Sequence, residues 1–164
     1  MKEKAGMSGR IIGRKIAEDG TVTEVFNHNI ITAQGDGMMA DMFLTPPTKN
    51  RVDSTHGYMV LGTGLASVTT PKNQTWVYTQ TGVPRLIDSG YPRLQGSFPN
   101  AVVEYKVTFP AGSLNASGIN EACLTNGASA VSAQAMAYAQ ITPSVNISTT
   151  DTFELTWQIT FLGT

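Results

Sequence analysis

The sequence predicts an all-β fold, a jelly roll or β-sandwich with one short helix at about residues 35–44. Three observations predict this class. Apolar and polar residues alternate along much of the chain, as in strands that bury one face. Turn residues separate these stretches about every 10 residues, which is typical of sandwiches and jelly rolls rather than βαβ units. Only one short stretch has its apolar residues at helical spacing.

The first patterned stretch, SGRIIGRKIAEDGTVTEVFNHNIIT, is expected to form a β-hairpin. Asp19 and Gly20 lie between two runs rich in Ile and Val, and Asp-Gly is a strong signal for a tight turn between strands. In AQGDGMMADMFLTPP, which follows, three methionines and a phenylalanine fall at helical spacing. Pro46 and Pro47 end this helix because proline cannot continue one.

The middle of the chain is expected to contain loops and edge strands. Residues 45–56 are polar and read as a loop, and GYMVLGTG reads as a buried strand that runs into a glycine turn. Residues 65–100 contain four prolines, which central strands exclude. We therefore expect long connections there, with short edge strands in TWVYT and PRLIDSGYPRLQG.

The later stretches AVVEYKVTF, GINEACLTNG, SAQAMAYAQI and DTFELTWQITF are each expected to form a strand. The second is closed by Asn126 and Gly127, and TPSVNISTTD is expected to connect the third to the fourth. The inward faces of the first and fourth supply the predicted structural core: Val103, Tyr105, Val107, Phe109, Phe153, Leu155, Trp157, Ile159 and Phe161. The fourth is expected to be indispensable to the fold.

A chain of 164 residues suits one domain. We expect a basic N-terminal arm over residues 1–15 and a single β-sandwich domain over residues 16–164. Charged residues make up 14% of the chain, well below the roughly 25% of an average domain. A surface rich in uncharged polar residues suits packing against other protein.

The basic cluster near the N-terminus predicts a docking arm. Its members are Lys2, Lys4, Arg10, Arg14 and Lys15. Such an arm can bind nucleic acid or an acidic protein surface. A net charge of -1 and the absence of aromatic residues before Phe26 favour a protein partner.

No set of residues predicts catalysis, a cofactor or a metal site. Neither His28 nor His56 has a second His or a Cys at zinc-ligand spacing, and no nucleophile motif surrounds Ser54. Cys123 lies in an alternating strand and reads as a small buried hydrophobe. We therefore expect a protein that is not an enzyme. The start of the chain lacks the apolar core of a signal peptide, and no apolar run is long enough for a membrane span.

Glu121 is the most informative single carboxylate. It lies in a strand beside an apolar stretch. It either forms a cross-strand charge pair, or is buried and bonded to backbone amides or to an arginine such as Arg85 or Arg93. Both alternatives are structural, because a lone carboxylate does not form an acid–base pair.

Four stretches, in order, resemble the pattern of small virion proteins of tailed bacteriophages. They are NHNIITAQGDGMMADMFL, YMVLGTGLASVT with its GTG turn, GINEACLTNG, and AQAMAYAQITPSVNISTTDTFELTWQITF with its closing W-x-I-T-F. The resemblance covers roughly residues 25–164 and is weakest over residues 65–100. Cys123 stands where the pattern usually has glycine.

The resemblance implies a jelly-roll or β-sandwich protein of the phage particle. We expect a capsid decoration (cement) protein, made in the host cytoplasm, that binds the major capsid protein on the particle exterior as a dimer or trimer. Two alternatives remain open. One is a tail, baseplate or tail-fibre adaptor subunit, and the other is a carbohydrate-binding module, for which Trp76, Tyr78 and Tyr91 are the candidate aromatic residues.

Overall fold

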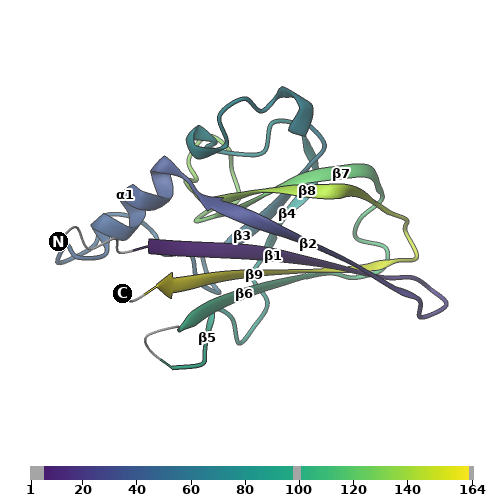
Figure 1. The fold of residues 1–164 in the computed structure, drawn as a ribbon, viewed down its shortest axis with the longest axis horizontal. Helices are drawn as coiled ribbons and strands as arrows, with labels where there is room; N and C mark the ends of the chain where they lie inside the picture. Colours follow the sequence, from purple (N-terminus) through teal and green to yellow (C-terminus); the bar gives the residue numbers. More distant parts are fainter. Residues whose placement is uncertain (1–5, 98–100, 163–164) are drawn as a thin grey trace.

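The computed structural model describes residues 6–97 and 101–162, which form nine strands, one α-helix and two short 3-10 turns (Figure 1). The strands are β1 (Gly6–Ile16), β2 (Val22–Ile31), β3 (Tyr58–Gly62), β4 (Gln80–Leu86), β5 (Arg93–Gln95), β6 (Val102–Phe109), β7 (Ala116–Thr125), β8 (Ala135–Ile147) and β9 (Thr152–Leu162). The helix is α1 (Ala33–Asp41), and the 3-10 turns are Leu65–Ser67 and Pro71–Asn73.

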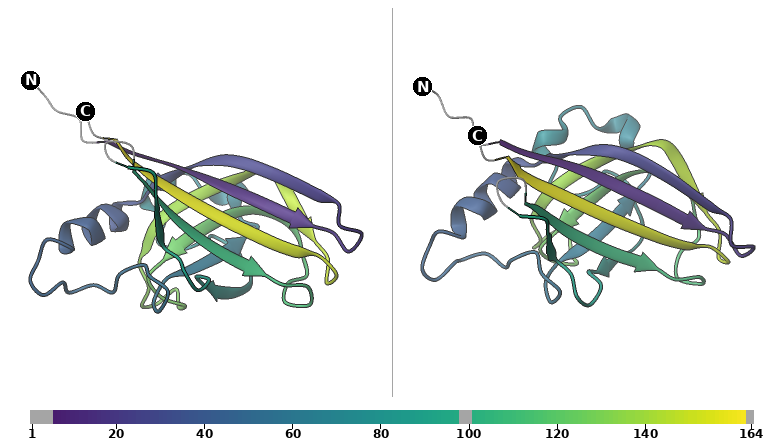
Figure 2. Two further views of the ribbon diagram at one scale, coloured as in Figure 1. Left: turned by 90° about the horizontal axis from the view of Figure 1, so that it is seen from below. Right: turned by 60° about the horizontal axis from the view of Figure 1, so that its bottom comes forward.

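All nine strands belong to one antiparallel sheet in the order β4-β3-β7-β8-β2-β1-β9-β6-β5. The sheet curls, so that β3, β7 and β8 lie across the main core from β1, β9 and β6 (Figure 2). The all-β class with one short helix is therefore confirmed. The two layers expected of a sandwich are the two halves of one continuous sheet.

The two ends of the curled sheet approach each other beyond β4. The backbone N–H of Asp88 donates to the carbonyl of Lys106 on β6, and the Asp88 carboxylate accepts from Thr108 N and Oγ1 at 3.1 and 2.7 Å. These contacts cover the part of the β6 edge that β5 leaves free. Pro84 lies in β4, an edge strand, where a missing N–H is tolerated.

The hairpin predicted at Asp19 and Gly20 is present between β1 and β2. Gly20 has φ +82°, the left-handed conformation that glycine adopts without strain, and its N–H donates to Ala17 at 2.9 Å. The Asp19 carboxylate accepts from Thr21 N at 2.9 Å.

β1 corrects the expectation of an arm over residues 1–15. Lys2 and Lys4 lie outside the described residues, but β1 begins at Gly6 and is paired along its length, with β9 on one side and β2 on the other. Arg10, Arg14 and Lys15 are thus part of a central strand. The arm was predicted because basic residues are concentrated in this segment. Ile11 and Gly13 (inward) nevertheless alternate with Arg10 and Arg14 (outward), which is a strand pattern.

α1 begins earlier than predicted because Thr32 is its N-cap, and it ends at Asp41, before the predicted end at residue 44. The Thr32 Oγ1 accepts from Gly35 N at 3.0 Å and donates to the carbonyl of Ala135 on β8. A Cβ on Gly35 would lie 2.0 Å from the Met136 carbonyl, so glycine allows α1 to approach β8 this closely. The helix is thereby fixed against one end of the sheet.

β8 is longer than predicted and continues through TPSVNI, which was expected to be a connection. β2 pairs with β8 only at Ala137, Tyr138 and Ala139, and the register between β7 and β8 shifts around Pro143. Proline removes no ladder hydrogen bond at such an irregularity. In the proline-rich middle, TWVYT is not a strand, and β4 begins directly after it.

β9 is the central strand of its half of the sheet. It lies between β1 and β6, and its inward residues Phe153, Leu155, Trp157 and Ile159 are all 0% exposed. Tyr105, Val107 and Phe109 on β6 are buried beside them, whereas Val103 and Phe161 are partly buried and pack against the same core. Every second residue of β9 therefore fills the space between the two halves.

We predict that Trp157→Ala lowers the free energy of unfolding by about 3–5 kcal/mol, because it leaves a large cavity at a fully buried site. Thr156→Ala, on the outer face of the same strand, is the matched control and should cost less than about 1 kcal/mol. Urea denaturation measures both. Equal losses on the two faces would contradict a core that lies on one side of β9.

Candidate functional site

The first candidate site is a buried carboxylate, that of Glu121 on β7, which is 0% exposed. Its Oε1 accepts from Gly64 N at 2.8 Å and from Thr79 N at 3.0 Å. Its Oε2 accepts from Tyr78 N at 3.0 Å and from the Tyr138 hydroxyl at 2.9 Å. Hydrogen bonds to an ionised acceptor are stronger than neutral ones, and four donors satisfy both oxygens.

The glycine turn after β3 is shaped to approach this carboxylate. A Cβ on Gly62 would lie 2.5 Å from Glu121 Oε1 and 2.8 Å from the Thr79 carbonyl, and a Cβ on Gly64 would lie 2.7 Å from Thr79 N. Side chains at these two positions would push the backbone away from Glu121. The LGTG turn therefore serves to bring the Gly64 N–H onto the carboxylate.

The structure decides between the alternatives left open for Glu121. The carboxylate is buried and bonded to backbone amides, as one alternative stated, but neither arginine reaches it. Arg93 instead binds Glu104 at 2.6 Å. The sequence could not identify the amide donors, because Gly64, Tyr78 and Thr79 lie far from Glu121 along the chain and outside regular strands.

The groups around Glu121 are held in their neutral forms. Burial, and secondarily the hydrogen bond to Glu121, raise the pKa of Tyr138 well above its ordinary value. Burial and the Glu121 charge likewise raise the pKa of the Cys123 thiol, which is 0% exposed. A protonated, enclosed thiol is a poor nucleophile. This cluster can hold four chain segments together, and its geometry offers no open position for a substrate.

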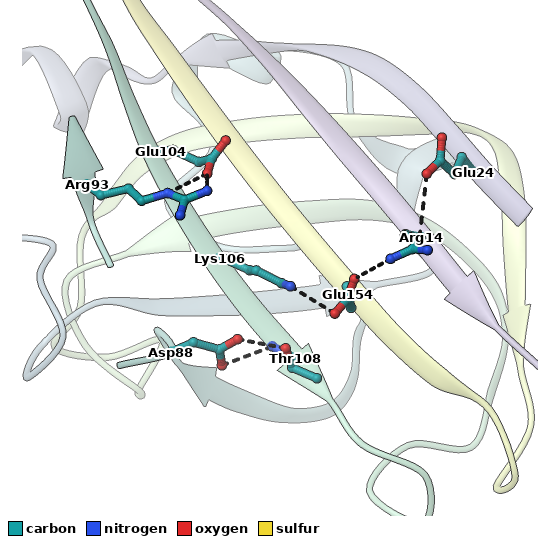
Figure 3. A network of polar contacts seen from close by, with 8 residues as sticks. All are labelled: Arg14, Glu24, Asp88, Arg93, Glu104, Lys106, Thr108 and Glu154. Atoms are coloured by element: carbon teal, nitrogen blue, oxygen red, sulfur yellow. Dashed lines mark hydrogen bonds and ion pairs between the residues drawn. The ribbon is translucent and has the colours of Figure 1, made fainter. Parts of the chain in front are cut away.

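The outer face of the sheet carries two rows of polar contacts that cross the strands. Figure 3 shows the row through Glu154 and, of the other row, the Arg93–Glu104 pair. In one row, Glu154 on β9 binds Lys106 at 2.8 Å and Arg14 at 3.4 Å, and Arg14 also lies 3.6 Å from Glu24 on β2.

The second row runs parallel to the first. Arg10 donates to Gln158 at 2.5 Å, and Gln158 donates to Glu104 at 2.6 Å. Arg93 completes the row at Glu104 and stacks over Tyr91, 4.6 Å from the ring centroid.

These rows correct the second part of the arm prediction. The charges of Arg10, Arg14 and Lys15 were expected to pair with carboxylates of a partner. Lys15 pairs with Asp151 at 3.2 Å and Arg14 pairs with Glu154 and Glu24, all within the chain, whereas Arg10 bonds to the neutral side chain of Gln158. The positive charges of Lys15 and Arg14 are thus compensated within the domain.

The remaining polar candidates are dispersed. His28 lies on β2 opposite Arg10, and His56 lies in a loop with its Nδ1 3.4 Å from Asp53. Within residues 6–97 and 101–162, no group of three or more His, Cys, Asp or Glu residues is placed to hold a metal ion. Nor does that part of the chain contain a helix long and apolar enough to cross a membrane.

The three candidate aromatic residues do not share one exposed face. Trp76 is buried in a second, smaller apolar cluster, and its Nε1 donates to Gln80 at 3.0 Å. Tyr91 is partly buried under Arg93, and Tyr78 alone is largely exposed. Sugar-binding modules need several exposed rings together, and these three rings do not provide that arrangement.

Exposed apolar side chains form two surfaces that were not predicted from the sequence. The first, which we call the outer stripe, consists of Val22, Phe26 and Ile30 on the outer face of β2. The second, the apolar ridge, consists of Met42, Phe43 and Leu44 directly after α1, with Phe43 90% exposed. Two features of the sequence indicate these surfaces. Apolar residues occur on both faces of β2, and an apolar run continues past the end of α1.

Beside the apolar ridge, a pocket of about 640 Å³ opens at the end of the curled sheet. We call it the end pocket. α1 contributes Met38 and Met39, Met42 follows the helix, and the inner face of the sheet contributes Tyr105 and Phe161 among others. The helix and the loop after it project beyond the strands here, at the end opposite the β1–β2 hairpin (Figure 2).

Comparisons with protein-family models, with curated proteins and with solved structures found no match.

We predict that Glu121→Gln lowers the free energy of unfolding by about 3 kcal/mol, because the amide nitrogen of Gln faces buried N–H donors and cannot accept from them. Tyr138→Phe, which removes one of the four donors, should cost about 1–2 kcal/mol. Glu154→Gln on the outer face is the control for loss of one charge. Urea denaturation that shows Glu121→Gln to be no more costly than Glu154→Gln would rule out the proposed role of the buried carboxylate.

The outer-face rows predict a loss of stability in acid. The hydrogen bond from Lys106 is the main cause that holds the pKa of Glu154 below its ordinary value of 4.5. A lowered pKa in the folded state contributes stability above the unfolded value, and this contribution is lost as the pH falls through the folded value. Glu154→Gln should therefore lose less stability than wild type between about pH 6 and pH 3. Parallel pH profiles of the urea midpoint would show that Glu154 contributes nothing.

Proposed function

We propose that this protein is a structural component of a tailed-bacteriophage particle, and that it decorates the capsid by binding the major capsid protein. The observation that supports this proposal is the pair of exposed apolar surfaces, the outer stripe and the apolar ridge. They lie on a domain in which many charged groups pair with one another. The three ridge residues are consecutive, and contiguous apolar groups exposed on a small domain indicate contact with other protein. Such binding gains its free energy by removing apolar surface from water.

The motif resemblance supports the same proposal through the Glu121 site. Two of the four motifs that resemble phage virion proteins, the GTG turn and the strand IxEA, meet in space at one carboxylate. The glycines of one motif make room for the acid of the other. A resemblance in which separate motifs depend physically on each other is more informative than either motif alone.

The test is to locate the protein in purified particles of the virus that carries the gene. We expect mass spectrometry to detect the protein in intact particles, and gold-labelled antibody to decorate the shell. Particles made without the gene should release their DNA at a lower temperature. Label confined to the tail or baseplate would replace the capsid assignment by the adaptor alternative. Absence of the protein from particles would refute a virion role altogether.

A further inference from the structure

The apolar ridge and the end pocket are adjacent and form one surface. Met42 and Phe43 belong to the ridge and also line the pocket, together with Met39 of α1. The three ridge residues are consecutive and are 53%, 90% and 51% exposed. Three consecutive apolar residues left in water are unfavourable in a domain that acts alone. A small molecule enclosed in the pocket would leave Leu44 exposed, because Leu44 does not line the pocket, whereas a protein partner can cover both parts.

The pocket has the properties of a surface that accepts side chains. Its volume, about 640 Å³, is within the range of pockets that enclose whole ligands, so more than one side chain fits. Methionine is flexible and polarisable and adapts to partners of different shape. Tyr105 is 6% exposed, and the one acceptor its hydroxyl contacts among the described residues is Met136 Sδ at 3.9 Å, a weak acceptor.

Charge at the rim defines the partner further. The pocket is lined by Asp41 and Asp53 and by Lys49 and Arg51. Asp41 accepts from Thr48 N at 2.9 Å and Lys49 N at 2.8 Å. Asp53 accepts from Thr55 N and His56 N, both at 2.8 Å. Both carboxylates are thus engaged locally.

The two cations are in a different situation. The side chains of Lys49 and Arg51 make no hydrogen bond or ion pair with any residue in the described part of the chain. The rim therefore carries charges of both signs around an apolar pocket, and its two cations are the groups whose side chains lack partners in the described residues. A twofold contact pairs a surface with itself, so it would offer these cations only Asp41 and Asp53, whose oxygens already accept hydrogen bonds.

We propose that the end pocket and the apolar ridge bind a segment of a different virion polypeptide. Apolar side chains of that segment enter the pocket and cover Phe43, and its carboxylates pair with Lys49 and Arg51. This inference rests on the proposed function, because it supplies the surface by which the protein attaches to the particle. It identifies the attaching segment as apolar and acidic.

The experiment measures binding to particles made without the gene. The variants are Phe43→Ser with Leu44→Ser, which alters the ridge, and Lys49→Glu with Arg51→Glu, which reverses the charge of the two rim cations. Lys49→Arg with Arg51→Lys keeps the charge, and Val131→Ser removes an apolar side chain that is 97% exposed elsewhere. Urea midpoints equal to wild type verify that each variant folds.

We expect the ridge and charge-reversal variants to lose at least about tenfold in affinity, and both control variants to bind like wild type. Photo-crosslinking from p-benzoylphenylalanine at position 43 in assembled particles should join the protein to an apolar, acidic segment of another polypeptide. A crosslink to a second copy, or full binding by both altered variants, would overturn the inference while leaving the virion role intact. Failure of the wild type to bind particles would refute the proposed function, and the inference with it.

Discussion

The fold depends on one buried carboxylate. Glu121 is a charged group with no exposed surface, and burying it is tolerable only because four donors surround it. Three of those donors are backbone N–H groups from segments outside the strands, and the fourth is Tyr138 on the neighbouring strand β8. The turn after β3 and the segment before β4 therefore have a fixed position over β7. Loss of the carboxylate would leave buried N–H groups without acceptors as well as removing a contact.

The internal pairing of charges determines what remains available to a partner. Glu154 on β9 pairs with Arg14 on β1 and Lys106 on β6, and this reduces the free charge on the outer face of that half. Among the groups still available to a partner are the apolar side chains of the outer stripe and the apolar ridge and the two cations at the end pocket. Attachment through such a surface gains free energy from desolvation, and the cations contribute mainly orientation and specificity.

The features predicted correctly are those encoded by local pattern. The alternation of Phe153, Leu155, Trp157 and Ile159 specified β9 and its buried face, and Asp19-Gly20 specified the first hairpin. The features that were not predicted depend on contacts between residues far apart in the sequence. Arg10 was assigned to an arm because its partner, Gln158, lies at the other end of the chain. The end pocket was not predicted because a helix, a loop and several strands form it together. The predicted strand was shorter than β8 because Pro143 is tolerated only where the register between β7 and β8 shifts.

Amide hydrogen exchange at Gly64, Tyr78 and Thr79 tests the central role of Glu121 most directly. These three N–H groups lie outside regular strands, where exchange is normally fast. If the buried carboxylate holds them, they exchange only when the whole domain unfolds, with an opening free energy close to that of the amides in β7. Exchange at rates typical of mobile loops, while β7 stays protected, would contradict the account.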